Sequence, residues 1–238
     1  MANTVIINGK NLADFGAVMT DAKTLSAPNP QYETVEVDGR NGDLLIDRGR
    51  YSNYELQITG VLDGMKPADF YNNFIALRGY LMAQNGYVRI EEGSLPEYYR
   101  TGRLMGGITP NTSGEHYIRA FTLRYWCKPQ MWLKSGENGI DKTADFAVFN
   151  PTMYTARPLI RVYGTGTLTV GTNVITVVAG ASSYIDIDSE ILDCYEGTAN
   201  RNALVSMADG FPVFESGETE IQLSGITRVI VTPRWYTL

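Results

Sequence analysis

The sequence predicts a mostly β protein, in which an α+β N-terminal domain (a sheet or barrel with one helix) is followed by an all-β sandwich domain. Three observations support this prediction. Apolar and polar residues alternate with the two-residue period of strands over much of the chain. One segment has the spacing of an amphipathic helix. A polar stretch containing glycine separates two blocks of strand pattern.

The N-terminal half is expected to place one helix between strands. In residues 55–62 the alternation puts Leu56, Ile58 and Leu62 on one face of a strand. A helix is expected from Pro67 to Gln84, because proline suits the first helical position and an apolar residue recurs every three or four positions. Its stripe consists of Phe70, Phe74, Leu77 and Leu81. This helix should cover a sheet made by the flanking strands.

The C-terminal half is denser in strand pattern. The expected strands are residues 159–163, 167–170, 174–178, 184–187, 220–223 and 227–231. Gly164-Thr165-Gly166 and Gly171-Thr172-Asn173 are expected to be hairpin turns, because glycine and asparagine accept the positive φ that such turns require. Short strands with turn signals at close spacing predict a sandwich or barrel.

The domain boundary is expected between Trp132 and Asn150. The stretch from Lys134 to Gly139 is polar and contains two glycines, and strand pattern resumes after Asn150-Pro151. We therefore expect an N-terminal domain at 1–133, a linker at 134–149 and a second domain at 150–238.

Composition excludes some classes of function. The 238 residues include 20 Lys and Arg against 26 Asp and Glu, a net charge of −6, which argues against non-specific binding of nucleic acid. No stretch approaches the roughly 20 apolar residues of a membrane-spanning helix, and the first residues lack the features of a secretory signal. We expect a soluble protein made in the cytoplasm. Cys127 and Cys194 are then two buried thiols, with one bridge between them as the alternative.

The chain lacks the residues that most catalytic sites need. His116 is the single histidine, in a loop-like stretch, so a zinc helix motif with two histidines is excluded. No Gly-x-Ser-x-Gly elbow and no phosphate-binding glycine loop occur. We expect no catalytic residue, no metal and no cofactor.

Carboxylates offer one further possibility. Asp186, Asp188 and Glu190 alternate and would share one face of a strand, as a hard-cation or acid–base cluster would require. The same alternation predicts an outward, solvated strand face opposite Ile185 and Ile187, and we favour this interpretation.

The 15 tyrosines leave two main classes open. Exposed tyrosines anchor protein interfaces or stack on sugars. The chain is therefore a structural or interaction protein, or a carbohydrate-binding module, with an enzyme as the third class. A sugar platform would draw on Tyr154, Tyr163, Tyr184 and Tyr195.

Several phrases, in order, resemble the distal tail (Dit) proteins of siphophages. The N-terminal phrases are Val35–Leu45, Asp47–Asn53, the helix from Pro67, Gly86–Ile90 and Phe121–Pro129, the last similar to a closing strand and Cys-Lys-Pro turn. The C-terminal phrases are Asn150-Pro151, Ala156–Ile160, Gly164-x-Gly166, Tyr184–Glu190, Phe211-Pro212, Ser216-Gly217 and Val231–Trp235. The resemblance covers nearly the whole chain and implies a galectin-like β-sandwich as the C-terminal domain.

The resemblance also implies a structural role in a virion. Such proteins form a hexameric ring at the tail tip, whose N-terminal domains line a channel and whose C-terminal domains project outward. The implied partners are further copies of the chain, the tail-tube protein, the tail hub protein and a receptor-binding protein. DNA passes through the channel without sequence-specific binding, no membrane is involved, and synthesis takes place in the host bacterial cytoplasm. A carbohydrate-binding β-sandwich module is the alternative.

Two loops are candidates for contacts in such a ring. Glycine provides their turns, and arginine and tyrosine are common interface anchors. The candidate interface residues are Gly39, Arg40, Asn41, Gly42, Arg48, Arg50 and Tyr51. A solvated hairpin explains the same residues equally well. The net negative charge also suits a conduit that must not retain DNA.

Overall fold

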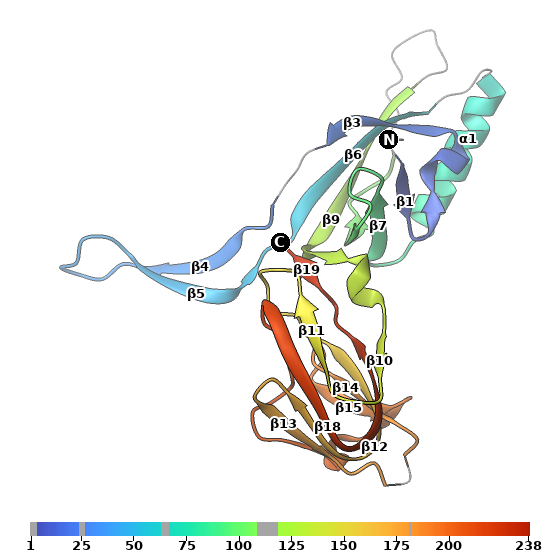
Figure 1. Ribbon diagram of the computed structural model, residues 1–238. Helices are drawn as coiled ribbons and strands as arrows, with labels where there is room; N and C mark the ends of the chain where they lie inside the picture. Colours follow the sequence, from blue (N-terminus) through green and yellow to red (C-terminus); the bar gives the residue numbers. More distant parts are fainter. Residues whose placement is uncertain (1–3, 24–26, 63–66, 109–118, 181) are drawn as a thin grey trace. The chain divides into compact units, whose positions relative to one another are not determined.

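The computed structural model describes residues 4–23, 27–62, 67–108, 119–180 and 182–238 (Figure 1). The chain divides into two compact units, an N-terminal unit (Met1–Met131 with Leu238) and a C-terminal unit (Trp132–Thr237). The expected mostly β fold, with an α+β unit followed by a β-sandwich, is confirmed. No helix in the described ranges is long and apolar enough to cross a membrane.

The N-terminal unit contains a sheet with the strand order β2-β1-β7-β8-β9-β6-β3, one α-helix and a separate two-stranded ribbon. Its elements are β1 (Val5–Ile7), β2 (Lys10–Asn11), η1 (Leu12–Phe15), β3 (Ala17–Lys23), β4 (Pro30–Val35), β5 (Leu44–Tyr51), β6 (Tyr54–Leu62), α1 (Pro67–Met82), β7 (Val88–Glu92), β8 (Tyr98–Leu104) and β9 (Arg119–Leu133), which continues into the next unit.

The predicted patterns account for the N-terminal core. Every second residue of β6 is buried, so Leu56, Ile58 and Leu62 lie in the core as expected. Leu77 and Leu81 of α1 are fully buried against them, which confirms the amphipathic helix. The helix ends at Met82, shortly before a glycine with a left-handed backbone (Gly86, φ 76°).

The C-terminal unit is a β-sandwich built around two long strands. Its elements are η2 (Lys134–Glu137), β10 (Ile140–Lys142), β11 (Phe146–Asn150), β12 (Leu159–Val170), β13 (Asn173–Val177), β14 (Ile185–Asp188), β15 (Asp193–Glu196), β16 (Ala199–Asn200), η3 (Asn202–Leu204), β17 (Val205–Met207), β18 (Gly217–Thr232) and β19 (Tyr236–Thr237). One half of β12 pairs with β14 and the other half with β13. Likewise, β18 pairs with β10 through one half and with β11 through the other.

The two long strands bend together at glycines. Gly166 of β12 lies against the backbone of β18, where a Cβ atom would come within 2.1 Å of the Ser224 carbonyl oxygen. The β12–β18 register shifts on both sides of Gly164. The expected hairpin turn at Gly164-Thr165-Gly166 is therefore wrong, because these glycines allow a close backbone approach inside a strand. The turn at Gly171 is confirmed, since Val170 pairs with Asn173 across it.

Residues 134–149 were expected to be a linker, and the structure differs from this expectation. This stretch carries η2, β10 and β11, and both strands pair with β18. The expected turn at Cys127–Pro129 is wrong, because β9 continues to Leu133. Cys127 and Cys194 are free, buried thiols in different units, as expected.

Candidate interaction surface

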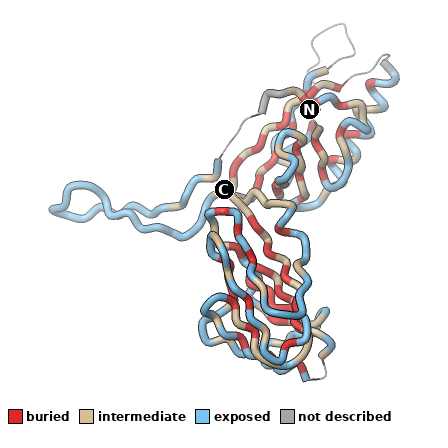
Figure 2. Tube along the Cα trace, viewed as in Figure 1, coloured by how far each residue is buried: buried red, intermediate tan, exposed pale blue. Residues whose placement is uncertain are grey.

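The most exposed element of the N-terminal unit is the ribbon formed by β4, β5 and the residues between them. We call residues 30–51 the arm. The two strands pair with each other and form a sheet of their own (Figure 1). Among the described residues, the N-terminal core contains no arm side chain. Nearly the whole arm is therefore exposed (Figure 2).

The arm carries aliphatic side chains on one face. The register places Val35 opposite Leu44 and Glu33 opposite Ile46, so these residues share a face. Val37 continues the alternation beyond the end of β4. We define the aliphatic face as Val35, Val37, Leu44 and Ile46, whose exposed fractions are 37–41%. Toward the base of the arm the same face carries Glu33, whose partner is Arg48. The opposite face pairs Tyr32 with Asp47 and Thr34 with Leu45.

Such a ribbon is weakly stable without a partner. An isolated two-stranded hairpin is marginal in water, and it needs a further layer on its apolar face. Burying aliphatic side chains that are now exposed supplies about 25 cal/mol for each Å² removed from water. Contact with a partner on the aliphatic face would therefore stabilise the arm.

All seven residues predicted to form an interface lie on the arm. Gly39 and Gly42, both with positive φ, shape the tip, and the Arg40 N–H donates to the Val37 carbonyl. Arg48 forms an ion pair with Glu33 across the strands. The first predicted loop thus forms the tip of the arm, whereas the residues of the second, Arg48 to Tyr51, belong to strand β5 and not to a loop. Arg50 and Tyr51 lie toward the base of the arm, and Asn41 lies in the tip.

The sequence interpretation missed the aliphatic face itself. The alternation Val35-Glu36-Val37 is typical of a strand. Alternation predicts which side chains share a face, but it does not show that this face lacks an intramolecular partner. The arginines and the tyrosine of the interface prediction lie on the same element as these aliphatic residues.

The tyrosines of the C-terminal unit do not form an open sugar platform. The rings of Tyr163 and Tyr184 lie 6.1 Å apart between centroids, but each has an arginine over it. Arg161 lies 4.1 Å above the Tyr184 ring, and Arg228 lies 5.2 Å above the Tyr163 ring. These ring faces are occupied by cation–π contacts. The other two candidates are engaged in other contacts: Tyr154 stacks on Tyr236, and Tyr195 donates a long hydrogen bond to Asp188.

The alternating carboxylates of β14 are neither solvated nor a metal site. Asp186 and Asp188 are 2% and 4% exposed, which contradicts the expected solvated face. Arg161 donates two hydrogen bonds to Asp186, and Arg234 donates two to Asp188. These arginines cover the outer face of the strand, so both carboxylates are buried as ion pairs. Glu190 is exposed.

The ionisation of Asp188 reflects this pairing. Burial opposes the charged form, but the hydrogen bonds and charge of Arg234 outweigh it, and the pKa of Asp188 is lowered. Within the described ranges no three His, Cys, Asp or Glu side chains converge as metal ligands would. His116 lies outside the described residues.

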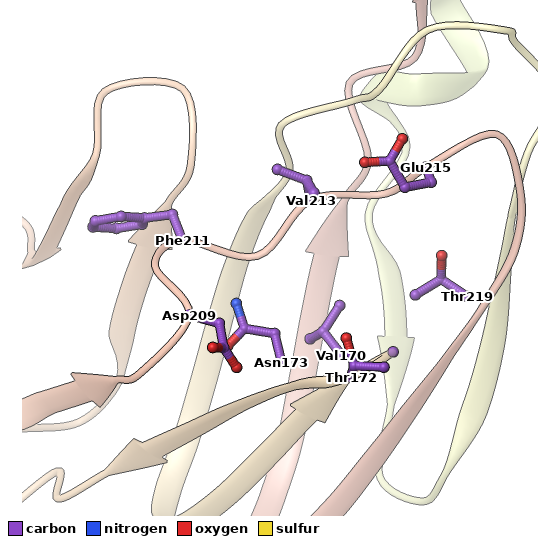
Figure 3. Close-up of a pocket in the computed structure, with 9 residues that line it drawn as sticks. Val170, Thr172, Asn173, Asp209, Phe211, Val213, Glu215 and Thr219 are labelled. Carbon is purple, nitrogen blue, oxygen red and sulfur yellow. The ribbon is translucent and has the colours of Figure 1, made fainter.

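A shallow pocket lies in the C-terminal unit (Figure 3). Its volume is about 410 Å³, and its lining includes Phe211, Asn173, Asp209 and Glu215. The polar groups are partly engaged already. The Asn173 amide donates to the Gly210 carbonyl, and Glu215 accepts from the Thr155 hydroxyl. The pocket combines exposed carboxylates with one aromatic ring and brings together no catalytic set.

Comparison with known proteins identifies the fold. Neither a protein-family model nor a curated protein matches the sequence. The Dit protein (gp 19.1) of phage SPP1, described as a paradigm of the hub adsorption apparatus in phages infecting Gram-positive bacteria, is similar over 100% of both chains, with a TM-score of 0.72 and 14% identity. A chain of the phage P2 baseplate in its activated conformation with Ca matches 99% of this chain over 98% of its own length, with a TM-score of 0.54 and 9% identity. The chain therefore has a Dit-like fold along its full length.

Proposed function

We propose that the chain is a distal tail protein, a structural component of a siphophage tail tip. The observation that carries this proposal is the likeness to SPP1 Dit over the whole of both chains. A match that includes both units, in the same order, is more specific than a shared β-sandwich alone.

In this proposal six copies form a closed ring that continues the tail tube. The ring joins the tail-tube protein to the tail hub protein, and receptor-binding proteins attach at its periphery. The arm is the element that we assign to contacts between copies, because its aliphatic face is exposed in the single chain. A closed ring buries one surface of each copy against a different surface of the next.

The net charge of −6 suits a DNA conduit. A channel with few cations avoids the release of counterions that would hold DNA in place. We expect the assembled ring to show no retardation of duplex DNA in a gel at low salt. A ring lumen crowded with Lys and Arg would contradict this part of the proposal.

Electron microscopy and native mass spectrometry of the full chain, alone and co-expressed with its tail-tube protein, test the proposal. We expect closed rings of six copies. The variants Leu44→Asp and Ile46→Asp should prevent ring formation, because each places a carboxylate on the aliphatic face. Leu45→Asp is the matched control, since Leu45 lies on the opposite face of the arm and should tolerate the charge.

Two outcomes would contradict the proposal. A chain that stays monomeric in both preparations would exclude a ring-forming role. A monomer that binds a glycan would instead favour the carbohydrate-binding alternative.

A further inference from the structure

Helix α1 carries a second apolar stripe on its exposed flank, beside the stripe that is buried in the core. Phe70, Leu77 and Leu81 point into the core of the N-terminal unit. Tyr71, Ile75 and Met82, about a quarter-turn around the helix, are 60%, 66% and 53% exposed. A surface helix normally presents polar residues on the side away from the core. Three large exposed apolar residues in one row therefore indicate a contact surface.

A single cation interrupts this row. Arg78 lies between Ile75 and Met82, at the helical spacing of three and four residues that places all of them on one side. We call Tyr71, Ile75, Arg78 and Met82 the outer stripe. Arg78 is exposed and has no ion-pair partner in the described part of the chain. The outer stripe is thus apolar with one uncompensated positive charge.

The arm has the complementary character. Beside its aliphatic face, the tip carries the exposed carboxylates Glu36, Asp38 and Asp43. These carboxylates also lack ion-pair partners among the described residues. The tip contains one cation, Arg40, so its net charge is negative. The outer stripe and the arm are therefore both apolar, and their charges are opposite, so the two surfaces are complementary.

The outer stripe is long enough to receive the aliphatic face. The outer stripe runs from Tyr71 to Met82, about 16 Å at the rise of an α-helix. The aliphatic face is two strands wide, about 5 Å, and extends about 7 Å along each strand before the tip adds its length. A ribbon of this width can lie along one side of a helix.

We propose that the aliphatic face of the arm docks on the outer stripe of α1 in a second copy of the chain. This inference rests on the proposed ring and names the surface that receives the arm. The arm and the helix are different surfaces of one chain, as a head-to-tail ring requires. Docking covers both exposed apolar surfaces and places Arg78 of one copy next to the acidic arm tip of the next.

Cysteine cross-linking of the full chain tests the contact. A copy carrying Leu44→Cys is mixed with a copy carrying Ile75→Cys, and a short bismaleimide is added. We expect a covalent dimer of the two variants. Both native cysteines are fully buried, so they do not compete for the reagent.

Controls use exposed positions on the other sides of the same elements. Leu45→Cys lies on the opposite face of the arm, and Ala76→Cys, which follows Ile75 directly and is also exposed, lies about 100° further around the helix. Mixtures containing either control should give at least about tenfold less dimer, because a short linker reports only neighbouring side chains. Equal dimer from the controls would overturn the inference.

Charge reversal provides an independent measurement. Arg78→Glu should lower the association constant of the chain about fivefold, since one exposed ion pair is lost and a repulsion replaces it. Combining Arg78→Glu with Asp43→Arg should recover most of that loss. Two independent, additive losses would show that these residues do not meet.

The results separate this inference from the proposed function. If Leu44→Cys links instead to Val18→Cys on β3, the copies associate through the arm but α1 is not the acceptor. If Ile75→Asp leaves rings intact while Leu44→Asp abolishes them, the same conclusion follows. If no arm position links to any other copy and the chain is monomeric, the proposed self-assembly itself is wrong.

Discussion

The buried ion pair between Asp188 and Arg234 should stabilise the C-terminal unit strongly. The Arg234 guanidinium donates hydrogen bonds of 2.6 and 2.9 Å to the two carboxylate oxygens. The Glu190 N–H donates a third, of 3.0 Å. Asp188→Asn keeps the size of the side chain but removes its charge and replaces one acceptor oxygen by a donor.

The magnitude follows from the burial of the two partners. Removing one member of a fully buried pair typically costs about 3–5 kcal/mol, because the remaining charge has no partner. The Asp188 side chain is 5% exposed, but that of Arg234 is 25% exposed and can be hydrated in part. We therefore expect Asp188→Asn to lower the free energy of unfolding by about 2 kcal/mol. In urea this corresponds to a midpoint lower by about 1–2 M.

Hydrogen exchange read by mass spectrometry, at increasing urea, is the appropriate assay for the full chain. Peptides from the two units report on two separate cores, so the method does not assume a single unfolding step. Peptides of β12, β14 and β18 should lose protection at lower urea in Asp188→Asn. Peptides of β6 and α1, in the other unit, should be unchanged.

Asp141→Asn is the matched control. Arg228 contacts Asp141 through the same two-pronged geometry, but the two side chains are 49% and 44% exposed. Exposed pairs contribute little, so this substitution should leave the midpoint unchanged. Equal midpoint shifts for the two variants would refute the reasoning from burial.

Three further predictions follow from described groups. The pKa of Asp188 is lowered in the folded chain, so the stabilisation by its carboxylate is present above the ordinary Asp pKa near 3.9 and is lost as pH falls through the folded pKa. Urea midpoints measured from pH 6 to pH 2.5 should therefore fall less steeply for Asp188→Asn than for the unmodified chain. Parallel curves would contradict this prediction. Burial raises the pKa of the Cys127 and Cys194 thiols to about 12. A thiol reagent at pH 8 should therefore modify two groups per chain only after the chain unfolds. Rapid labelling of the native chain would disprove this prediction. Gly166→Ala should destabilise the C-terminal unit by about 3 kcal/mol, because the new Cβ atom would collide with the backbone of β18. Gly79→Ala should instead stabilise α1 by about 0.5–1 kcal/mol, because the space around its Cβ position is open. Denaturant midpoints that shift in the same direction for both variants would contradict this prediction.

The sequence predicted the buried face of an element correctly where one hydrophobic periodicity extends over the whole segment. The alternation of Leu56, Ile58 and Leu62 and the stripe of Leu77 and Leu81 each predicted the buried face that the structure shows. In both cases the local pattern and the tertiary burial agree, so no information beyond the segment was needed.

Predictions were wrong where one residue type serves two purposes. Glycine in Gly164-Thr165-Gly166 predicted a turn, but it permits a close approach between β12 and β18. The spacing of Asp186 and Asp188 predicted an outward face, but not the arginines that bury it, because Arg234 is distant in sequence. The arm shows the same limit, since strand pattern alone does not reveal a face without a partner.

The pairing of β18 has a consequence for synthesis of the chain. β10, β11 and β12 all pair with this strand, and Leu159 is matched to Thr232, more than 70 residues later in the chain. The centre of the sandwich cannot form until β18 has left the ribosome, because three earlier strands pair with it. Folding of the unit is therefore dominated by distant pairings, which makes it slow. A chain truncated before Gly217 should lose the entire sandwich rather than one strand of it.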